Sequence, residues 1–245
     1  MSDQPVYVLL GGTGGIGQAL ARTLAPTARL MLGARSSESL RDLAAETGAA
    51  AYTVDATHAE AVELVIQETV NQYGRVDGVV NLVGSILIKP AHQTSAAEFA
   101  ETIALNLTSA FNTVKAAAPA MTDGGSIVLM ASVASEYGLP NHEAIAAAKG
   151  GVSGLVRSAA ATYAPKGVRV NALAPGLVRT PLSARLTRTE AQVQASARMH
   201  PLGRIGEPND IAQAIAFLLD AQASGWITGQ VLSVDGGLAT IRSRG

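Results

Sequence analysis

One stretch near the start of the chain, residues 6–24, constrains the fold more than any other. Its first five residues, VYVLL, are too few for a packed helix and rich in β-branched and aromatic side chains, so they predict a buried strand. Five closely spaced glycines follow, and then Ile16, Leu20 and Leu24 recur with helical spacing. A strand, a glycine turn and a helix start in this order form a phosphate cradle, because a backbone without Cβ atoms approaches a pyrophosphate and unpaired helix amides bind its charge. The stretch therefore favours a dinucleotide site over a purely structural turn.

The glycines fit three spacings, and the loop itself does not decide among them. Gly12, Gly14 and Gly17 fit the general G-x-G-x-x-G fingerprint. Gly11, Gly15 and Gly17 give G-x-x-x-G-x-G instead, and Gly11, Gly14 and Gly17 give G-x-x-G-x-x-G. The cofactor-binding residues expected in the turn are Gly11, Thr13, Gly15, Ile16 and Gly17.

Composition excludes several classes of function. A chain of 245 residues with 48% hydrophobic residues forms one large α/β domain or two small ones with a sizeable core. Its 18 basic and 19 acidic residues leave no basic stripe for nucleic acid, and no apolar run approaches membrane-spanning length. The lack of cysteine excludes disulfides, thiolate metal sites and a cysteine nucleophile, and no metal site is expected. The N-terminal MSDQP leads straight into the first strand, which favours a cytoplasmic protein.

Strand-like runs and helical patterns alternate along the chain without a composition break, a repeat or a linker. The seven expected strands cover residues 6–10, 29–32, 50–54, 76–81, 126–131, 168–173 and 230–234. The helices expected after the first one cover residues 38–47, 59–72, 96–121, 142–163 and 208–219. Each connection is too long for a hairpin and suits a right-handed parallel crossover. The expected fold class is therefore α/β, a doubly wound Rossmann-type parallel sheet of seven strands flanked by helices, in a single domain over residues 1–245.

Ligands of such sheets bind beyond the carboxyl ends of the strands, so the residues that follow each strand are candidate contacts. After the second strand no acid is present to bond a ribose 2′-hydroxyl, whereas Arg35 is available for a 2′-phosphate. This favours NADP(H) over NAD(H), against the alternative of a solvated loop arginine. Asp55 after the third strand suits the adenine amine, and Asn81 at the end of the fourth suits a tie between strand ends. Either residue also fits an ordinary turn.

Further motifs extend over nearly the whole chain. Besides Gly11, Gly15 and Gly17 they are Asp55 before Ala56, Asn81 to Gly84, Asn106-Leu107, Ser132, Lys149, Pro175-Gly176 with Thr180, and VDGG at residues 234–237. Through these motifs the chain resembles the short-chain dehydrogenase/reductase superfamily. Residues 127–132 and 167–180 resemble its single-domain, carbonyl-reductase-like branch rather than its extended branch. The resemblance implies the Rossmann-type fold and a nicotinamide cofactor.

The resemblance also implies roles for individual residues. Ser132 and Lys149 belong to the catalytic set, in which Lys149 bonds the nicotinamide ribose and the Ser132 hydroxyl bonds a substrate oxygen as charge develops. Asn106 would hold a helix kink and a water near Lys149, and Val178 and Thr180 would contact the carboxamide. The cofactor-binding set expected beyond the turn is Arg35, Asp55, Asn81, Gly84, Lys149, Pro175, Gly176, Val178 and Thr180.

One position departs from the family. A catalytic tyrosine is expected four residues before the lysine and about thirteen after the serine, where this chain has Ile145. Because the surrounding residues match closely, the general acid that hands a proton to the carbonyl oxygen is expected to be missing. A positioned general acid contributes roughly 10²- to 10⁴-fold, so ordinary ketone reduction should be impaired unless another group substitutes.

Two nearby side chains are candidate substitutes for the acid. His142 lies three residues before Ile145, so on a helix the imidazole shares its face one turn back, and imidazole titrates in the useful range. Tyr137 lies five residues after Ser132, in a loop that borders the expected substrate. A polar helix cap for His142 and a pocket wall for Tyr137 are the simpler interpretations.

Weaker signals concern the substrate and the assembly. Arg185, Arg188, Arg198 and His200 lie in the variable stretch that covers the substrate in the family. They suit an anionic substrate, but the intervening Ala, Gln, Thr and Ser favour a solvated helix face. The small residues over 144–154 allow close helix contact, and the resemblance implies a homo-oligomer, a dimer or a tetramer.

Three functional hypotheses follow for this chain. The first is an NADP(H)-dependent oxidoreductase that acts on a small carbonyl or alcohol substrate with a substitute acid or water. The second is reduction of an activated C=C bond, in which hydride goes to carbon and Ser132 with solvent suffices. The third is a cofactor-binding scaffold or sensor without catalysis. The retained Ser132, Lys149 and Asn106 favour an enzyme, whereas Ile145 argues against a conventional one.

Overall fold

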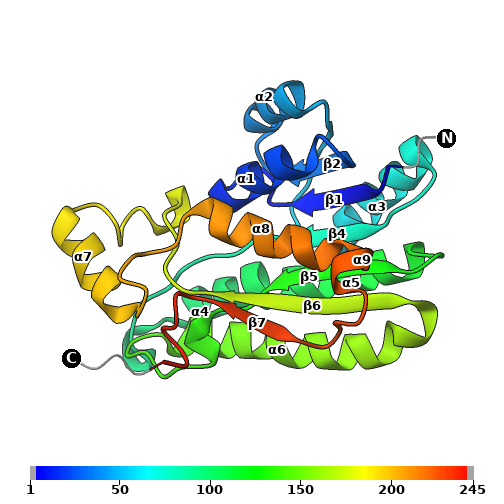
Figure 1. Ribbon diagram of the computed structural model, residues 1–245. Coiled ribbons are helices and arrows are strands. Elements are labelled where there is room, and N and C mark those ends of the chain that lie inside the picture. Colours follow the sequence, from blue (N-terminus) through cyan, green and yellow to red (C-terminus); the bar gives the residue numbers. More distant parts are fainter. Residues whose placement is uncertain (1–3, 242–245) are drawn as a thin grey trace.

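The computed structural model describes residues 4–241; residues 1–3 of the MSDQP segment and residues 242–245 of the domain expected over residues 1–245 lie outside the described residues. Seven parallel strands form one sheet in the order β3-β2-β1-β4-β5-β6-β7 (Figure 1). They are β1 (Val6–Leu10), β2 (Arg29–Ala34), β3 (Ala50–Thr53), β4 (Gly78–Asn81), β5 (Gly125–Met130), β6 (Val168–Pro175) and β7 (Val231–Val234). The doubly wound seven-stranded sheet expected from the sequence is confirmed.

Helices connect the strands and lie on both faces of the sheet (Figure 1). The described α-helices are α1 (Gly15–Leu24), α2 (Ser37–Thr47), α3 (Ala59–Tyr73), α4 (Ala96–Ile103), α5 (Ser109–Ala120), α6 (Glu143–Tyr163), α7 (Glu190–Met199), α8 (Pro208–Leu219) and α9 (Ala221–Ser224). None of the helices within residues 4–241 combines the length and the apolar character that crossing a membrane requires.

The sheet separates two hydrophobic cores, and this explains the unbroken apolar run of β1. Val8 and Leu10 face the core formed with α3, α5 and α6. Tyr7 and Leu9 face the core formed with α1, α2 and α8. A strand in the middle of a parallel sheet is buried on both faces, so its sequence shows no polar alternation.

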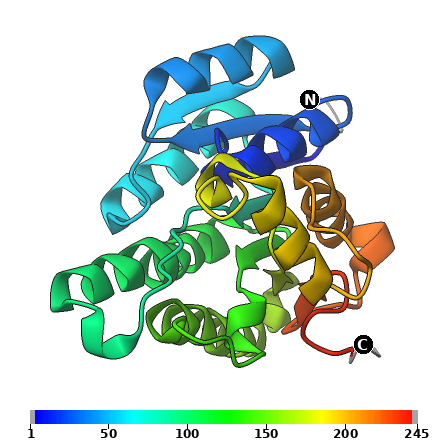
Figure 2. The ribbon, with the colours of Figure 1, turned by 90° about the vertical axis from the view of Figure 1, so that its left-hand side faces the viewer.

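The carboxyl ends of the strands meet at one edge of the sheet, on the left-hand side of Figure 1. The chain order reverses between β1 and β4: strands β2 and β3 follow outward from β1, and β5 to β7 follow outward from β4. In doubly wound sheets the ligand crevice opens beyond the carboxyl ends at such a reversal. Figure 2 looks onto this edge and shows the yellow and gold segment that contains α7 crossing in front of it.

Two helical regions differ from the sequence expectation. The single helix expected over residues 96–121 is divided by a π-helical turn, η2 (Ala104–Thr108), between α4 and α5. A π turn accommodates one extra residue without interrupting the helix, so apolar spacing does not detect it. Helix α7 was not expected, because none of its residues is buried and it therefore lacks the apolar stripe that predicts a helix.

Candidate active site

The glycine turn between β1 and α1 requires glycine at two of its positions, Gly11 and Gly17, and leaves little room for a side chain at Gly15. Gly11 has φ 80° and donates its N–H to the carbonyl oxygen of Gly33 at 2.7 Å. A Cβ atom on Gly17 would lie 2.5 Å from the Gly12 oxygen, and one on Gly15 would lie 3.0 Å from Cγ2 of Thr180. The contact to Thr180 is tight rather than forbidden, whereas the one at Gly17 leaves no room. The structure thus favours the spacing Gly11, Gly15, Gly17 among the three that the sequence left open.

The start of α1 is built to receive an anion. Its N-cap is Gly14, no side chain caps it, and its first turn carries no acidic residue. The first-turn amides therefore point their partial positive charge at the loop, which is the arrangement that binds phosphate. Gln18 donates from Nε2 to the Thr13 oxygen at 2.9 Å and so fixes the turn. This cradle fits the pyrophosphate of a dinucleotide, with Thr13 and Ile16 partly exposed within it.

Arg35 and Asp55 follow neighbouring strands at the same edge of the sheet. The Arg35 side chain is exposed directly after β2. Asp55 accepts hydrogen bonds from the Thr57 amide at 2.9 Å and the Thr57 hydroxyl at 2.7 Å. These bonds to Thr57 are the main cause that lowers the pKa of Asp55, with the charges of His58 and Arg35 acting in the same direction. The two residues thus lie at the carboxyl edge of the sheet, after the strands β2 and β3 on one side of the glycine turn.

Asn81 ties the end of β4 to a helix and a loop rather than to a neighbouring strand. Its Nδ2 donates to the hydroxyls of Ser109 and Thr113 at 3.3 and 2.9 Å, and its Oδ1 accepts from the Val83 amide at 2.8 Å. The whole amide is thus used within the protein, and Asn81 is only 3% exposed. Its contribution to a ligand site is to position the loop that leads to Gly84.

Lys149 on α6 is buried close to the end of β5. Its Nζ donates to the Met130 oxygen at 2.7 Å, and burial lowers the pKa of Lys149 to about 8. The Asn106 amide donates to the Ser85 hydroxyl and the Thr102 oxygen, both at 2.9 Å, so the π turn carries a side chain that holds the β4 loop. A Cβ atom on Gly84 would lie 2.8 Å from Oδ1 of Asn106 and 3.5 Å from Nζ of Lys149. Glycine at this position therefore lets the backbone reach both groups.

Two adjoining cavities open at the carboxyl edge. The smaller has a volume of about 160 Å³, and Ser183 and several apolar side chains belong to its lining. Nine of the expected site residues and Ile145 also line it: Ile16, Gly84, Asn106, Ser132, Ile145, Lys149, Pro175, Gly176, Val178 and Thr180. The larger, of about 470 Å³, shares Ser132, Ile145 and Gly176 with it and extends toward α7. The Ser132 hydroxyl oxygen accepts from the Ala134 amide at 3.1 Å, which leaves its proton available to a ligand.

Only one of the two candidate substitute acids borders these cavities. His142 at the N-cap of α6 lines the larger cavity beside Ile145. Its Nδ1 lies 2.8 Å from the Pro140 oxygen, and because a carbonyl only accepts, Nδ1 carries the hydrogen. Tyr137 is 46% exposed and lines neither cavity.

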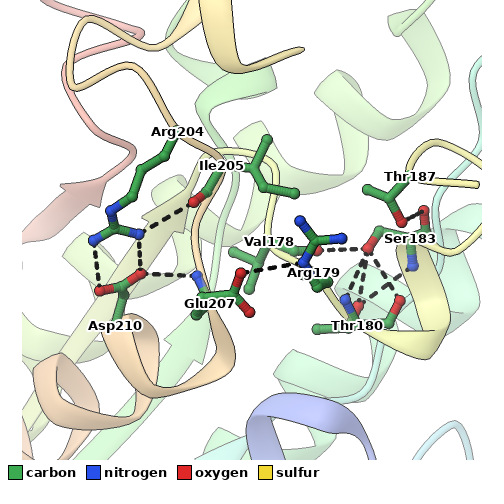
Figure 3. A network of polar contacts seen from close by, with 9 residues as sticks. All are labelled: Val178, Arg179, Thr180, Ser183, Thr187, Arg204, Ile205, Glu207 and Asp210. Carbon is green, nitrogen blue, oxygen red and sulfur yellow. Dashed lines mark hydrogen bonds and ion pairs between the residues drawn. The ribbon is translucent and has the colours of Figure 1, made fainter. Parts of the chain in front are cut away.

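The loop after β6 is held by a polar network that Figure 3 shows. Ser183 donates its hydroxyl to the Val178 oxygen at 2.5 Å, and its amide donates to Oγ1 of Thr180 at 3.3 Å. Arg179 pairs with Glu207, the N-cap of α8, at 3.1 Å. The network fixes the backbone that brings Val178 and Thr180 to the smaller cavity.

His200 corrects one sequence expectation. Arg185, Arg188 and Arg198 are exposed and line neither cavity, but His200 is only 4% exposed, so the solvated helix face was wrong for it. Its Nδ1–H donates to the Ser196 oxygen at 2.7 Å, and its Nε2 accepts from the Leu177 amide at 3.2 Å. The imidazole thus joins the end of α7 to the loop after β6.

Sequence reasoning named His200 but missed its burial, because that burial depends on contacts with residues far away in the chain. A Cβ atom on Gly176 would lie 2.6 Å from Nε2 of His200, so glycine makes the space that the imidazole occupies. It also missed the apolar wall of the larger cavity. The available signal for that wall was a pair of isoleucines outside any expected strand, Ile86 and Ile88. In the structure they are 41% and 40% exposed.

Comparison with known proteins gives a consistent result. A family model described as enoyl-(acyl carrier protein) reductase matches residues 11–239. A 3-oxoacyl-(acyl-carrier-protein) reductase of Thermotoga maritima is 34% identical over 245 residues, which cover 95% of this chain and 97% of that protein. The solved structure of a short-chain type dehydrogenase/reductase from Mycobacterium ulcerans has a TM-score of 0.92 at 31% identity and covers 99% of this chain and 92% of its own. An actinorhodin polyketide ketoreductase variant solved with NADPH has a TM-score of 0.91 at 29% identity over 98% of both chains.

Proposed function

Because the chain belongs to the short-chain dehydrogenase/reductase superfamily, an oxidoreductase family, we propose that it is an NADP(H)-dependent oxidoreductase with an altered catalytic centre, acting on a small carbonyl or alcohol substrate. One observation carries the proposal. Ser132 and Lys149 line the same cavity as Ile145, so two polar groups of the resembled centre are kept and an apolar side chain lies beside them.

The cofactor preference rests on Arg35. No acid ends β2, and the exposed guanidinium is available for a 2′-phosphate, which it binds well because its planar fork matches phosphate oxygens. The structural relative solved with NADPH is consistent with this choice. The glycine turn takes the pyrophosphate, while Lys149, Val178 and Thr180 border the place proposed for the nicotinamide end.

The bound nicotinamide supplies or accepts a hydride. The chain's own residues must then stabilise the oxygen on which negative charge develops. Ser132 is suited to this, because its oxygen is held by the Ala134 amide while its proton is left for the substrate oxygen. Lys149 adds a buried positive charge at the same cavity and, by the same proposal, bonds the ribose.

Proton transfer is the step that Ile145 alters, because its side chain has no proton to give. His142 is the substitute that the geometry supports, since it borders the same cavity as Ser132 and Ile145. With Nδ1–H bonded to the Pro140 oxygen, the imidazolium form carries its second proton on Nε2. That proton passes to the substrate oxygen during reduction and returns from it during oxidation. Water is the competing donor.

Reduction of an activated C=C bond is the second candidate, and the description of the matching family model favours it. In that reaction hydride goes to carbon, and the oxygen of the conjugated carbonyl needs a hydrogen bond rather than full protonation in the slow step. Ser132 supplies that bond without help from position 145. An apolar Ile145 would then contact the alkene instead of hindering the chemistry.

The same proposal includes a homo-oligomer, a dimer or a tetramer. Members of the superfamily are typically oligomeric, and Gly150 and Gly154 on α6 leave open space where a Cβ atom would be. Two such positions support close approach of another helix. The cytoplasmic location stays a prediction from the sequence.

The test compares NADPH oxidation by wild type, Ile145→Tyr and His142→Ala on matched ketones and enones. Under carbonyl chemistry, Ile145→Tyr raises ketone reduction at least about tenfold, a small part of what general acid catalysis supplies. His142→Ala lowers kcat and changes the pH profile, whereas Tyr137→Phe, a change outside both cavities, leaves both unchanged. Under C=C chemistry, Ile145→Tyr crowds the alkene and lowers enone reduction.

Ordinary rates of ketone reduction by wild type, with His142→Ala silent, would refute the claim that this centre is altered. Absence of NADPH oxidation with every ketone and enone, by a protein that binds NADPH, would refute both catalytic candidates.

A further inference from the structure

Among residues 4–241, no charged side chain lines the larger cavity. Its 19 described lining residues include no Asp, Glu, Lys or Arg. The apolar ones come from several segments, among them the β4 loop, the segment before α6, the loop after β6, and α7. Its polar lining residues are Ser132, His142, Gln192, Ser196 and His200. A ligand that enters here meets mostly hydrocarbon surface.

Two of those polar side chains are already engaged within the protein. Both ring nitrogens of His200 are used, one by the Leu177 amide and the other by the Ser196 oxygen. Gln192 accepts from the Thr189 amide through Oε1 at 3.1 Å as part of the cap of α7. Ser132, which lines both cavities together with Ile145, and His142 are left to bond a ligand oxygen, while the remaining polar side chain, Ser196, lies on α7.

Three arginines of the segment that contains α7 do not contribute charge to the cavity lining. Arg185, Arg188 and Arg198 are exposed and absent from the lining. A carboxylate or a phosphate group held inside the cavity would therefore lose its hydration without gaining a fixed positive partner from residues 4–241. A neutral hydrocarbon body loses nothing on entry and gains by leaving water.

We propose that the substrate is a neutral carbonyl compound with an apolar body, whose single polar end lies beside Ser132 and His142, and that the cavity rejects analogues with an anionic group on that body. This inference rests on the proposed oxidoreductase function for the identity of the reacting group. It goes further in naming the class of substrate, and it separates this chain's cavity from a site built for a substrate carboxylate.

The test is a binding measurement with two matched ligands, 4-tert-butylcyclohexanone and 4-oxocyclohexanecarboxylate. Calorimetric titration is done with NADP⁺ present, because the oxidised cofactor cannot reduce a ketone and the ligands stay intact. We expect the neutral ketone to bind at least about tenfold more tightly, since an unpaired carboxylate in an apolar site costs more than one such factor.

A positive charge placed on the cavity wall should weaken the preference for the neutral ligand. Ile88 is 40% exposed at the cavity, so Ile88→Arg can hold its guanidinium in solvent while reaching the ligand. We expect this variant to lower the ratio of neutral to anionic affinity at least about fivefold. Leu64→Arg is the matched control, because Leu64 is 57% exposed on α3 and lines neither cavity, and its ratio should equal that of wild type.

The outcomes separate the two claims. Equal or tighter binding of the carboxylate by wild type overturns the proposed substrate class, and so does a lack of binding by both ligands. The neutral ketone could bind more tightly and yet not be reduced when NADPH is added. If no other neutral carbonyl compound or enone is reduced either, the proposed function is refuted, while the proposed binding preference is still supported. An unchanged ratio in Ile88→Arg overturns the assignment of this cavity as the place where the body of the ligand lies.

Discussion

Lys149 holds its ammonium group where water hardly reaches, at 7% exposure, with the Met130 oxygen as its hydrogen-bond acceptor. A carbonyl dipole compensates only part of the hydration that the charge loses, and for this reason the pKa of Lys149 falls from 10.5 to about 8. A charged lysine at this place therefore destabilises the cofactor-free fold near neutral pH. Lysine at this position therefore lowers the stability of the fold, as expected of a group that serves binding or catalysis.

The pH dependence of stability follows from that shift. Below the folded-state pKa of about 8, Lys149 is charged in both states and the fold bears the cost of burial. Between about 8 and 10.5 the unfolded chain keeps the proton that the fold has lost, so the free energy of unfolding rises with pH. Lys149→Met removes this contribution, which amounts to about 3 kcal/mol over the window.

The measurement is urea unfolding of wild type and Lys149→Met without cofactor, followed by circular dichroism near pH 7.5 and near pH 10. The difference between the two proteins isolates Lys149, because other groups, such as Tyr7 with its raised pKa, titrate in both. Parallel pH dependences for the two proteins would contradict the burial of the charge.

Within the glycine turn and the start of α1, the glycines differ in how well they tolerate an added side chain. Gly17 lies within α1, where alanine is favoured by about 1 kcal/mol on propensity alone. The Cβ atom of an alanine would nevertheless lie 2.5 Å from the Gly12 oxygen, so the turn would have to move. At Gly14 the φ of −67° suits any residue, and a Cβ atom would meet only the Gly11 oxygen, at 3.3 Å.

We therefore expect Gly17→Ala to abolish NADPH binding and to lower the melting temperature, and Gly14→Ala to keep the affinity within about threefold, because a lost N-cap glycine costs little. Fluorescence titration with NADPH and thermal unfolding measure the two effects. Equal losses in both variants would mean that the turn responds to any added side chain, and the proposed spacing would be wrong.

Strands and helices were predictable from the sequence where a strand is buried on both faces or where a helix has apolar residues at regular spacing. The run at β1 is apolar throughout because both faces are buried, and α1 repeats its apolar residues with helical spacing. The turn η2 was not predictable, since its extra residue shows only in hydrogen bonds such as that from Asn106 to the Thr102 oxygen. Helix α7 was missed because it buries no residue.

Some residues of the candidate site were predictable from local sequence motifs, and others were not. Ser132 and Lys149 were placed from motifs near strand ends, and the structure brings both to one cavity. His200 and Tyr137 were misjudged, because whether a side chain at a helix end or in a loop turns inward depends on residues far away, such as Gly176 beside His200. The residues next to His200 in the sequence do not indicate that Gly176 leaves space for its side chain.

For the whole molecule, the proposed cofactor would connect the two halves of the sheet. The phosphate turn and Arg35 belong to the β1–β3 half, while Lys149 and Thr180 belong to elements around β5 and β6. A ligand bound to both halves stabilises the entire fold, by about 2.7 kcal/mol at a concentration near 100 times its Kd. For a chain of this size, that corresponds to a rise in melting temperature of about 5 to 10 °C.

We expect NADPH at that concentration to produce this rise and NADH at the same concentration to produce less, because a lost charge-assisted pair to the 2′-phosphate costs about 1.5 to 3 kcal/mol. Arg35→Ala should bring the two cofactors together, while Arg41→Ala, which removes an exposed arginine of α2, should not. Thermal unfolding with each cofactor measures this. Equal shifts for both cofactors in wild type would count against the NADP(H) preference.

The strand order also determines the order in which the strands can pair during synthesis. A ribosome releases β1, β2 and β3 in succession, and these pair as neighbours, but the inner edge of β1 stays open until β4 emerges. Until then the partial sheet presents unpaired backbone groups that other nascent chains can join. The phosphate turn comes out among the first residues, whereas Thr180 and Pro181, whose side chains lie against Gly15, follow only after six strands. The binding cleft is therefore among the last parts of the molecule to close during synthesis, and a truncated translation product that contains the glycine turn still lacks the wall that completes it.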